Sequence, residues 1–116
     1  MTDPVSKLLK IFRVELEDSE KNVLDLVEYY AKRFNEHNIT SYVWQENKAL
    51  LQMELSCLAA LEKDLRAWDP GDETDLGKVL DEASIFLKGL AKKRDYPELV
   101  ALVIDKISNK LNRYLE

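Results

Sequence analysis

Residues 49–61, with the sequence ALLQMELSCLAAL, constrain the fold of this chain more than any other stretch. Nine of these thirteen residues are Ala, Leu or Met, and none is a Gly, Pro or β-branched residue that would disfavour a helix. The large apolar side chains spread over more than the ~100° stripe that a surface helix buries. A helix that is apolar over so much of its circumference needs neighbours on several sides. We therefore expect it to be the central helix of a bundle.

The composition supports a single all-α domain that spans residues 1–116. Of the 116 residues, 46% are hydrophobic and 34% are charged, a balance typical of globular domains of this size. The chain has only three Gly and three Pro, which is few for the turns of a β protein.

Apolar spacing and capping residues predict four helices, at about 4–36, 41–68, 74–93 and 96–115. Asp3-Pro4 is typical of a helix start, and Asp72 or Thr74 is the expected cap of the third helix. The apolar phase of the first helix continues through the polar run at 17–22, which favours one long helix; the alternative is a break there. The short connections predict an up-down-up-down antiparallel four-helix bundle.

Charge and hydropathy argue against several classes of partner. The net charge is −5 and is evenly distributed, which disfavours nucleic acid and anionic membranes as main partners. No segment approaches the ~18 apolar residues of a membrane span, and the N-terminal stretch lacks the apolar core of a signal peptide. With a single cysteine and no export signal, a cytoplasmic location is expected.

The sequence offers little catalytic chemistry, and we expect no catalytic residue, cofactor or metal site. His37 is the only histidine and lies at the end of the first predicted helix, where Asn38 is the expected left-handed residue. Cys57 lies in the most apolar stretch, without an adjacent base, and is expected to be a buried apolar side chain.

Carboxylates are the one alternative route to chemistry. A metal-dependent all-α hydrolase would need inward-facing carboxylates about one helical turn apart. Glu46 and Glu54 are eight residues apart, which is too far for such a pair. We expect a solvated polar face, with the hydrolase kept as an alternative function. The nearest candidate ligands are Glu46, Glu54, Asp81, Glu82 and Asp105.

Two apolar features are wider than a bundle of this size needs. Aromatic residues cluster around the first connection, at the end where the first two helices should extend past the shorter second pair. In the fourth predicted helix, LVALVI at 99–104 is six consecutive apolar residues. Exposed aromatic surface usually marks an interface, although these side chains could instead pack on one another. The predicted interface residues are Tyr29, Tyr30, Phe34, Tyr42, Trp44, Val100 and Ile104, with Trp44 as the anchor.

These observations favour a non-enzymatic helical-bundle protein-interaction module that associates with itself as a homodimer. A small acidic cytosolic chaperone or adaptor for another protein is an alternative within the same class.

Overall fold

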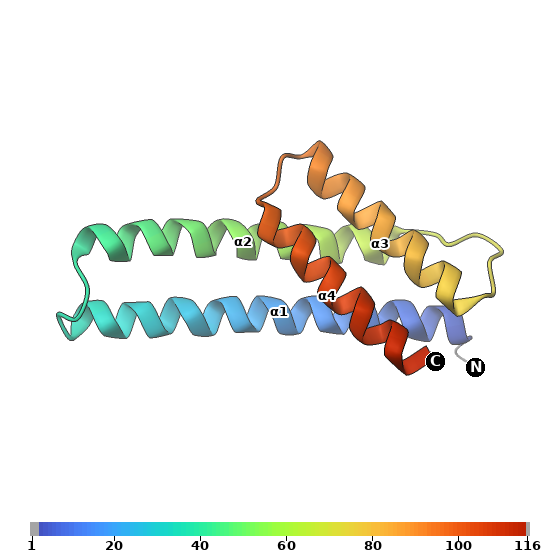
Figure 1. The fold of residues 1–116 in the computed structure, drawn as a ribbon, viewed down its shortest axis with the longest axis horizontal. Helices are drawn as coiled ribbons and strands as arrows, with labels where there is room; N and C mark the ends of the chain where they lie inside the picture. The colour runs from blue at the N-terminus through green and yellow to red at the C-terminus, as the bar shows by residue number, and fades with distance from the viewer. Residues whose placement is uncertain (1–2, 116) are drawn as a thin grey trace.

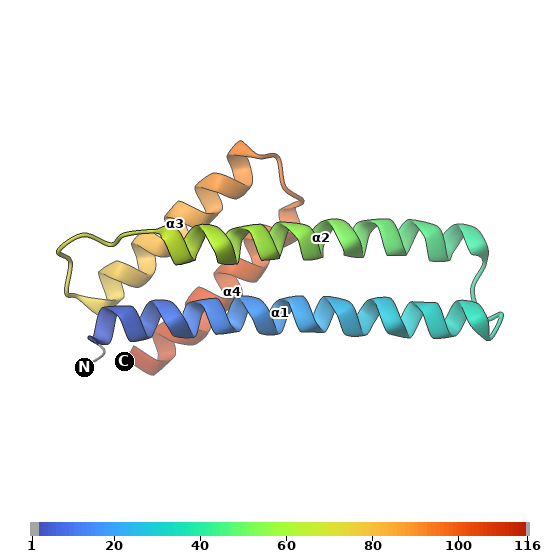
Figure 2. The same ribbon diagram turned by 180° about the vertical axis from the view of Figure 1, so that it is seen from behind.

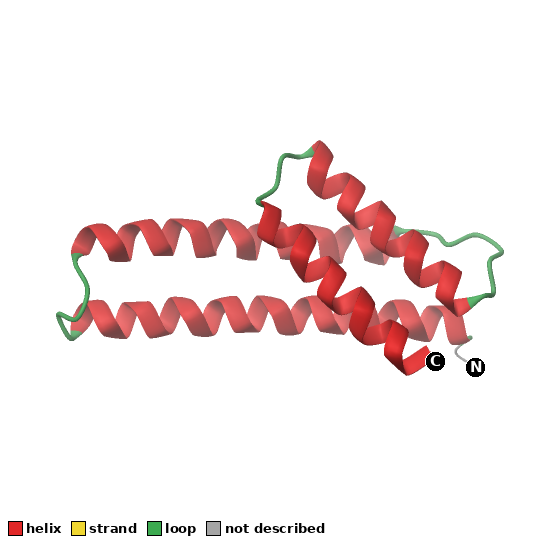
Figure 3. Ribbon diagram, in the orientation of Figure 1, coloured by secondary structure: helices red, strands yellow, loops and turns green. Residues whose placement is uncertain are grey.

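The computed structural model describes residues 3–115, which form four α-helices and no strand within that range. The helices are α1 (Pro4–Asn35), α2 (Ser41–Ala67), α3 (Leu76–Lys93) and α4 (Glu98–Leu115), shown in Figures 1 and 3. The all-α prediction is confirmed, and every helix begins and ends within two residues of its expected bounds. None of these helices is both long enough and apolar enough to cross a membrane.

α1 is one uninterrupted helix, so the alternative of a break at 17–22 is wrong. The carboxylate of Asp3 caps its start by accepting the backbone N–H of Ser6 at 2.9 Å. Within the polar run, the Ser19 hydroxyl donates to the Glu15 carbonyl oxygen at 3.1 Å, one turn earlier. Ser19 therefore bonds back into the helix instead of capping a new one.

The end of α1 is closed by His37, not by Asn38 as expected. His37 has a φ of 62°, and its N–H donates to the Phe34 carbonyl oxygen at 3.0 Å. The N–H of Asn38 donates to the Arg33 carbonyl oxygen at 2.9 Å. These two bonds form a Schellman motif, in which the residue after the cap takes the left-handed conformation. The helix ends one residue earlier than predicted, and this shifts the left-handed position to the histidine.

α3 begins two residues later than expected, because Asp75 caps it in place of Asp72 or Thr74. The Asp75 carboxylate accepts the N–H of Lys78 at 3.2 Å. Before the cap, the carboxylate of Glu73 accepts the N–H of Asp75 at 3.0 Å, which keeps this segment out of the helix.

The α3–α4 connection also ends in a Schellman motif. Asp95 has a φ of 56°, and the N–H of Tyr96 donates to the Ala91 carbonyl oxygen at 2.9 Å. Asp95 therefore closes α3, and α4 begins at Glu98, directly after Pro97. This explains why α4 starts two residues later than predicted.

The four helices form two antiparallel hairpins that differ in length. α1 and α2 lie side by side along the length of α2, and the first turns of α1 continue past the end of α2 (Figures 1 and 2). The shorter α3–α4 hairpin crosses one face of this pair obliquely at the end that holds the N-terminus. The helix contacts are consistent with a four-helix bundle, and the regular up-down-up-down order stays a prediction. The molecule measures 55 × 27 × 23 Å, and its radius of gyration is 16.5 Å, whereas a compact domain of this length has about 13 Å.

One apolar core lies where the two hairpins cross. The stacked rings of Trp68 and Phe86, with centroids 5.7 Å apart, join the end of α2 to α3 at this crossing. The largest side chains with almost no exposed area come from all four helices: Phe12, Leu16, Leu58, Leu61, Leu65, Leu80, Leu87, Ile104 and Leu111.

The stretch 49–61 is surrounded mainly in its second half, where Cys57, Leu58 and Leu61 are buried. In the first half Leu51 is buried, whereas Leu50 and Met53 are about half exposed. The expectation of neighbours on several sides along the whole stretch is therefore wrong. The α3–α4 hairpin is too short to cover the first half of this helix.

Candidate functional site

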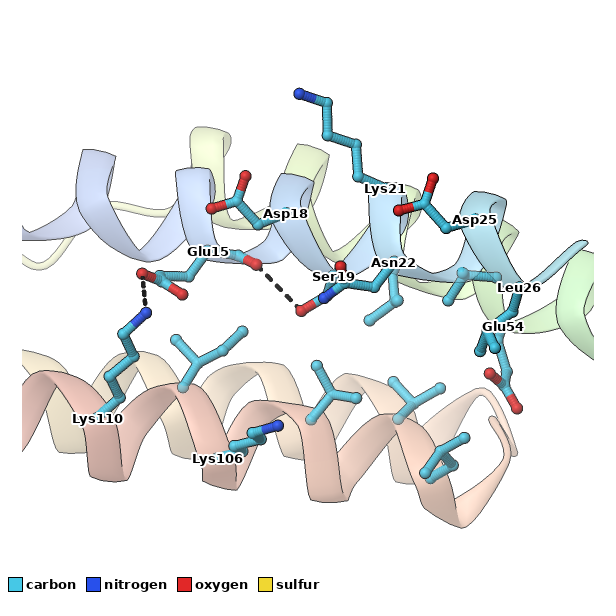
Figure 4. A pocket seen from close by; sticks show the side chains of 16 residues that line it. Glu15, Asp18, Ser19, Lys21, Asn22, Asp25, Leu26, Glu54, Lys106 and Lys110 are labelled. Atoms are coloured by element: carbon cyan, nitrogen blue, oxygen red, sulfur yellow. Dashed lines mark hydrogen bonds and ion pairs between the residues drawn. The ribbon is translucent and has the colours of Figure 1, made fainter. Parts of the chain in front are cut away.

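A groove of about 630 Å³ runs between α1 and α4 and reaches α2 at one end. Figure 4 shows it from close by, with Leu26 and Glu54 at the end next to the start of α4. Its lining is apolar along the floor and charged along the rim. The apolar lining residues are Val23, Leu26, Leu58, Leu99, Val100, Val103 and Ile107.

The rim of the groove is held by an ion pair between α1 and α4. Lys110 Nζ donates to Glu15 Oε1 at 2.8 Å, and this hydrogen bond raises the pKa of Lys110. Both groups remain partly exposed, so the pair contributes little to stability. In Figure 4, Asp18 and Asp25 point away from α4, so the rim does not converge on a point inside the groove. The groove can bind an apolar side chain, but it lacks a set of converging polar groups for catalysis.

Beyond the groove, the long hairpin carries an exposed apolar face. Val23 is the last buried residue of α1, and Leu51 is the first buried residue of α2. Residues 24–35 of α1 therefore extend ~18 Å past the last buried residue of this helix at 1.5 Å per residue, and of these Val27 and Tyr30 still pack, partly buried, against the core. We call the exposed face of this extension the shelf. It is formed by Leu26, Tyr29, Val43 and Leu50, and Leu99 lies at its inner end.

The shelf continues the stripe that is buried elsewhere along the same helices. On α2, Leu50 lies seven residues before Cys57 and eleven before Leu61, which places all three on one side of the helix. Cys57 and Leu61 are buried, whereas Leu50 is 52% exposed. On α1, Leu26 lies eighteen residues, or five turns, after the buried Leu8 and is 45% exposed. Each helix therefore carries its core-facing stripe past the point where the core ends.

The predicted aromatic tip is largely packed on itself. Phe34 stacks on Trp44, with ring centroids 6.1 Å apart and planes inclined by 14°. Tyr29 and Tyr30 meet edge to face, with centroids 5.4 Å apart. Tyr42 is the most exposed aromatic of the group, at 74%. Trp44, the expected anchor, is thus already half-buried by its own chain.

Val100 and Ile104, the two predicted interface residues of α4, are fully buried inside the core. They have no surface to offer a partner, which corrects the prediction for this helix. The apolar run at 99–104 is wide because it faces two environments. Leu99 and Leu102 point outward and are about half exposed.

The candidate carboxylates are not brought together. Asp105 accepts a hydrogen bond from Lys88 Nζ at 2.8 Å, and Glu54 lies at the end of the groove, where burial raises its pKa. Glu46, Asp81 and Glu82 are exposed on the surface. Residues 3–115 contain no group of three or more Asp, Glu, His or Cys side chains that could hold a metal ion.

The surroundings of Cys57 and His37, the two other candidate residues, indicate structural roles. Cys57 is buried, and burial raises the pKa of its thiol, which disfavours the reactive thiolate. His37 is exposed in the left-handed position that closes α1.

Leu26, Leu50 and Leu99 are exposed surface residues that the sequence pattern did not predict. The signal was present, because the predicted length difference between the hairpins already required some core-facing positions to be uncovered. Finding which ones required the register of α4 on α1, which the sequence pattern does not contain. The chain matches no known protein-family model, no curated protein and no solved structure.

Proposed function

We propose that the chain is a non-enzymatic protein-interaction module that associates with itself, and that the shelf is its binding surface. The observation that carries this proposal is the continuation of the core-facing stripe past the end of the core. On α1 this stripe runs from the buried Leu8 to the exposed Leu26, and on α2 from the exposed Leu50 to the buried Leu61. A stripe of this kind is the surface that a helix normally buries against another helix.

The energetics support a partner on this surface. Burying a whole Leu side chain contributes about 1.5–3 kcal/mol of free energy. Each half-exposed leucine of the shelf therefore lacks roughly half of this stabilisation in the single chain. Several such side chains on one face are the usual mark of an interface, whereas isolated apolar residues on a surface are normal.

The remaining features agree with binding more than with catalysis. The groove lacks converging polar groups, and the thiol of Cys57 is buried with a raised pKa. The free, buried cysteine also supports the proposal that the protein acts in the cytoplasm, where thiols stay reduced.

Two leucines on opposite sides of α1 provide the test. Leu26 lies on the shelf and is 45% exposed, whereas Leu24 is 47% exposed and lies two residues away, about 200° around the helix. Sedimentation of the parent protein at roughly 100 µM should give about twice the chain mass of 13.5 kDa. Leu26→Lys should shift the mass toward that of one chain, and Leu24→Lys should leave it unchanged.

Two results would count against the proposal. A parent protein that sediments as a monomer at this concentration does not associate with itself. Equal behaviour of the two variants would show that the shelf is not the interface.

A further inference from the structure

We propose that the chain has a second self-contact besides the shelf, in which one side of α1 pairs with the same side of α1 in another copy, antiparallel and around a twofold axis. We call this side the α1 edge. It is formed by Lys7, Ile11, Val14 and Asp18, which are all exposed and follow one another at intervals of four, three and four residues. This spacing places the four side chains in one row along the helix.

The α1 edge faces away from α2. Phe34 of α1 faces α2, because it stacks on an aromatic ring of that helix. Val14 and Ile11 lie 20 and 23 residues before Phe34, which is about 200° and 140° around the helix. They therefore point to the side opposite α2, where Ile11 is 39% and Val14 is 44% exposed. Together with Lys7 and Lys10 they line a shallow hollow of about 460 Å³.

The end of α4 carries apolar side chains that a helix beside the α1 edge would cover. The last turn of α4 lies past α1, on the side away from α2 (Figures 1 and 2). Tyr114 and Leu115 follow the buried Leu111 by three and four residues, so they continue the side that α4 buries. Tyr114 is nevertheless 72% exposed and Leu115 is 37% exposed, because α4 has passed α1 at this point. A helix placed alongside the α1 edge would lie beneath both side chains.

Charge along the α1 edge favours a second copy of α1 as this helix. The two apolar residues lie between Lys7 on one side and Asp18 on the other. A twofold axis perpendicular to α1, midway between Ile11 and Val14, places Ile11 of each copy opposite Val14 of the other. The same axis places Lys7 opposite Asp18, since each lies four residues further from the midpoint. A parallel pair would instead place Lys7 opposite Lys7 and Asp18 opposite Asp18.

The charges that flank the row follow the same pattern. Lys10 and Glu17 are exposed and lie seven residues apart, so they share one flank of the α1 edge. In the antiparallel pair, Lys10 of each copy lies within one turn of Glu17 of the other. Such exposed ion pairs select the orientation but contribute little affinity. We therefore expect a contact that is weaker than the one at the shelf and forms at higher concentration.

Leu26→Lys isolates this contact, because it changes the shelf and leaves the α1 edge intact. This variant should sediment as one chain at roughly 100 µM and approach twice the chain mass of 13.5 kDa at ~1 mM. Circular dichroism checks that its helices are intact.

Charge reversal in the Leu26→Lys protein tests the pairing of Lys7 with Asp18. Lys7→Glu alone and Asp18→Lys alone should each stay close to the mass of one chain at ~1 mM, because each homodimer would contain two repulsive contacts. An equimolar mixture of the two should approach twice the chain mass, since both contacts in the mixed dimer are then attractive. Lys63→Glu is the matched control on exposed surface of α2 and should leave the dimer unchanged.

Cross-linking in the Leu26→Lys protein measures the orientation directly. Lys7→Cys mixed with Asp18→Cys should form a disulfide between chains under mild oxidation. Either variant alone should form much less, because identical positions in the antiparallel pair lie eleven residues, or ~16 Å, apart along the helices. The native Cys57 is buried and does not compete. Efficient cross-linking of each variant alone, without gain in the mixture, would show a parallel pair and overturn the proposal.

The α1 edge and the shelf fail separately in these measurements. A Leu26→Lys protein that remains one chain at ~1 mM overturns the contact at the α1 edge and leaves the shelf in place. A parent that is monomeric at roughly 100 µM, with a Leu26→Lys protein that pairs at ~1 mM, overturns the shelf and leaves the α1 edge in place. Equal effects of Lys63→Glu and Lys7→Glu would also overturn the contact at the α1 edge.

Discussion

Phe34 of α1 stacks on Trp44 of α2 at the far end of the long hairpin, with ring centroids 6.1 Å apart and planes inclined by 14°. Phe34 follows the last buried residue of α1, and Trp44 precedes the first buried residue of α2. The stack therefore holds the two helices together in a part of the molecule that the core does not reach. The pair also shows which turns of the two helices lie level with one another at this end of the hairpin.

Trp44→Ala should lower the free energy of unfolding by about 1–3 kcal/mol, because it removes an aromatic pair and a large half-buried side chain. Thermal unfolding followed by circular dichroism measures the change. Tyr42→Ala, at a position 74% exposed, is the control and should leave the midpoint nearly unchanged. Equal midpoints for the two variants would show that the stack does not stabilise the tip.

Leu58→Ala should cost about 2–5 kcal/mol, because Leu58 is fully buried where the two hairpins cross and its truncation opens a cavity. Leu24→Ala removes the same atoms from an exposed position off the shelf and should cost well under 1 kcal/mol. Chemical denaturation of both variants gives the comparison. A small effect at Leu58 would contradict the placement of the core at this crossing.

Asp95→Gly should stabilise the protein by about 0.5–1 kcal/mol, because Asp95 holds a φ of 56° that glycine adopts without steric cost. His37→Gly should act in the same direction for the same reason. Gly71→Ala is the opposite case, since alanine is strained at a φ of 73° and should destabilise. Thermal midpoints of the three variants check the signs, and a loss of stability at Asp95→Gly would mean that its side chain contributes more than the strain costs.

Glu20 should make stability depend on pH. Burial, followed by the negative charges of Glu62 and Glu17, raises the pKa of Glu20 above its ordinary value of 4.5. The folded state therefore binds the proton more tightly than the unfolded chain, and this contribution to stability is lost as the pH rises through the raised pKa.

Glu20→Gln should accordingly have a higher unfolding midpoint than the parent at pH 7, and the difference should shrink as the pH falls below 4.5. Glu46→Gln removes one negative charge from an exposed position and is the control for the change in net charge. A parent that is more stable than Glu20→Gln at pH 7 would contradict the assignment.

Local chemistry in the sequence determined the helices and their approximate ends. A capping carboxylate and a proline without an N–H affect only the backbone within about one helical turn, so they identify a helix boundary without knowledge of the fold. Examples are Asp3-Pro4 at the start of α1 and Asp69-Pro70-Gly71 after α2. The apolar phase of α1 likewise predicted one continuous helix, because helical periodicity is a property of the segment alone. The length difference between the hairpins followed from the same residue counts.

Only the tertiary structure decided which apolar side chains are covered. Val100, Ile104, Leu99 and Leu102 share one apolar run, yet the first two are buried and the last two are exposed. Periodicity gives a helix its apolar side, but the angle and register at which two helices cross depend on how their side-chain ridges interlock. The oblique crossing of α3–α4 over α1–α2 therefore selected Leu26 and Leu50 as the exposed end of the core-facing stripe, because the shorter hairpin ends before it reaches them.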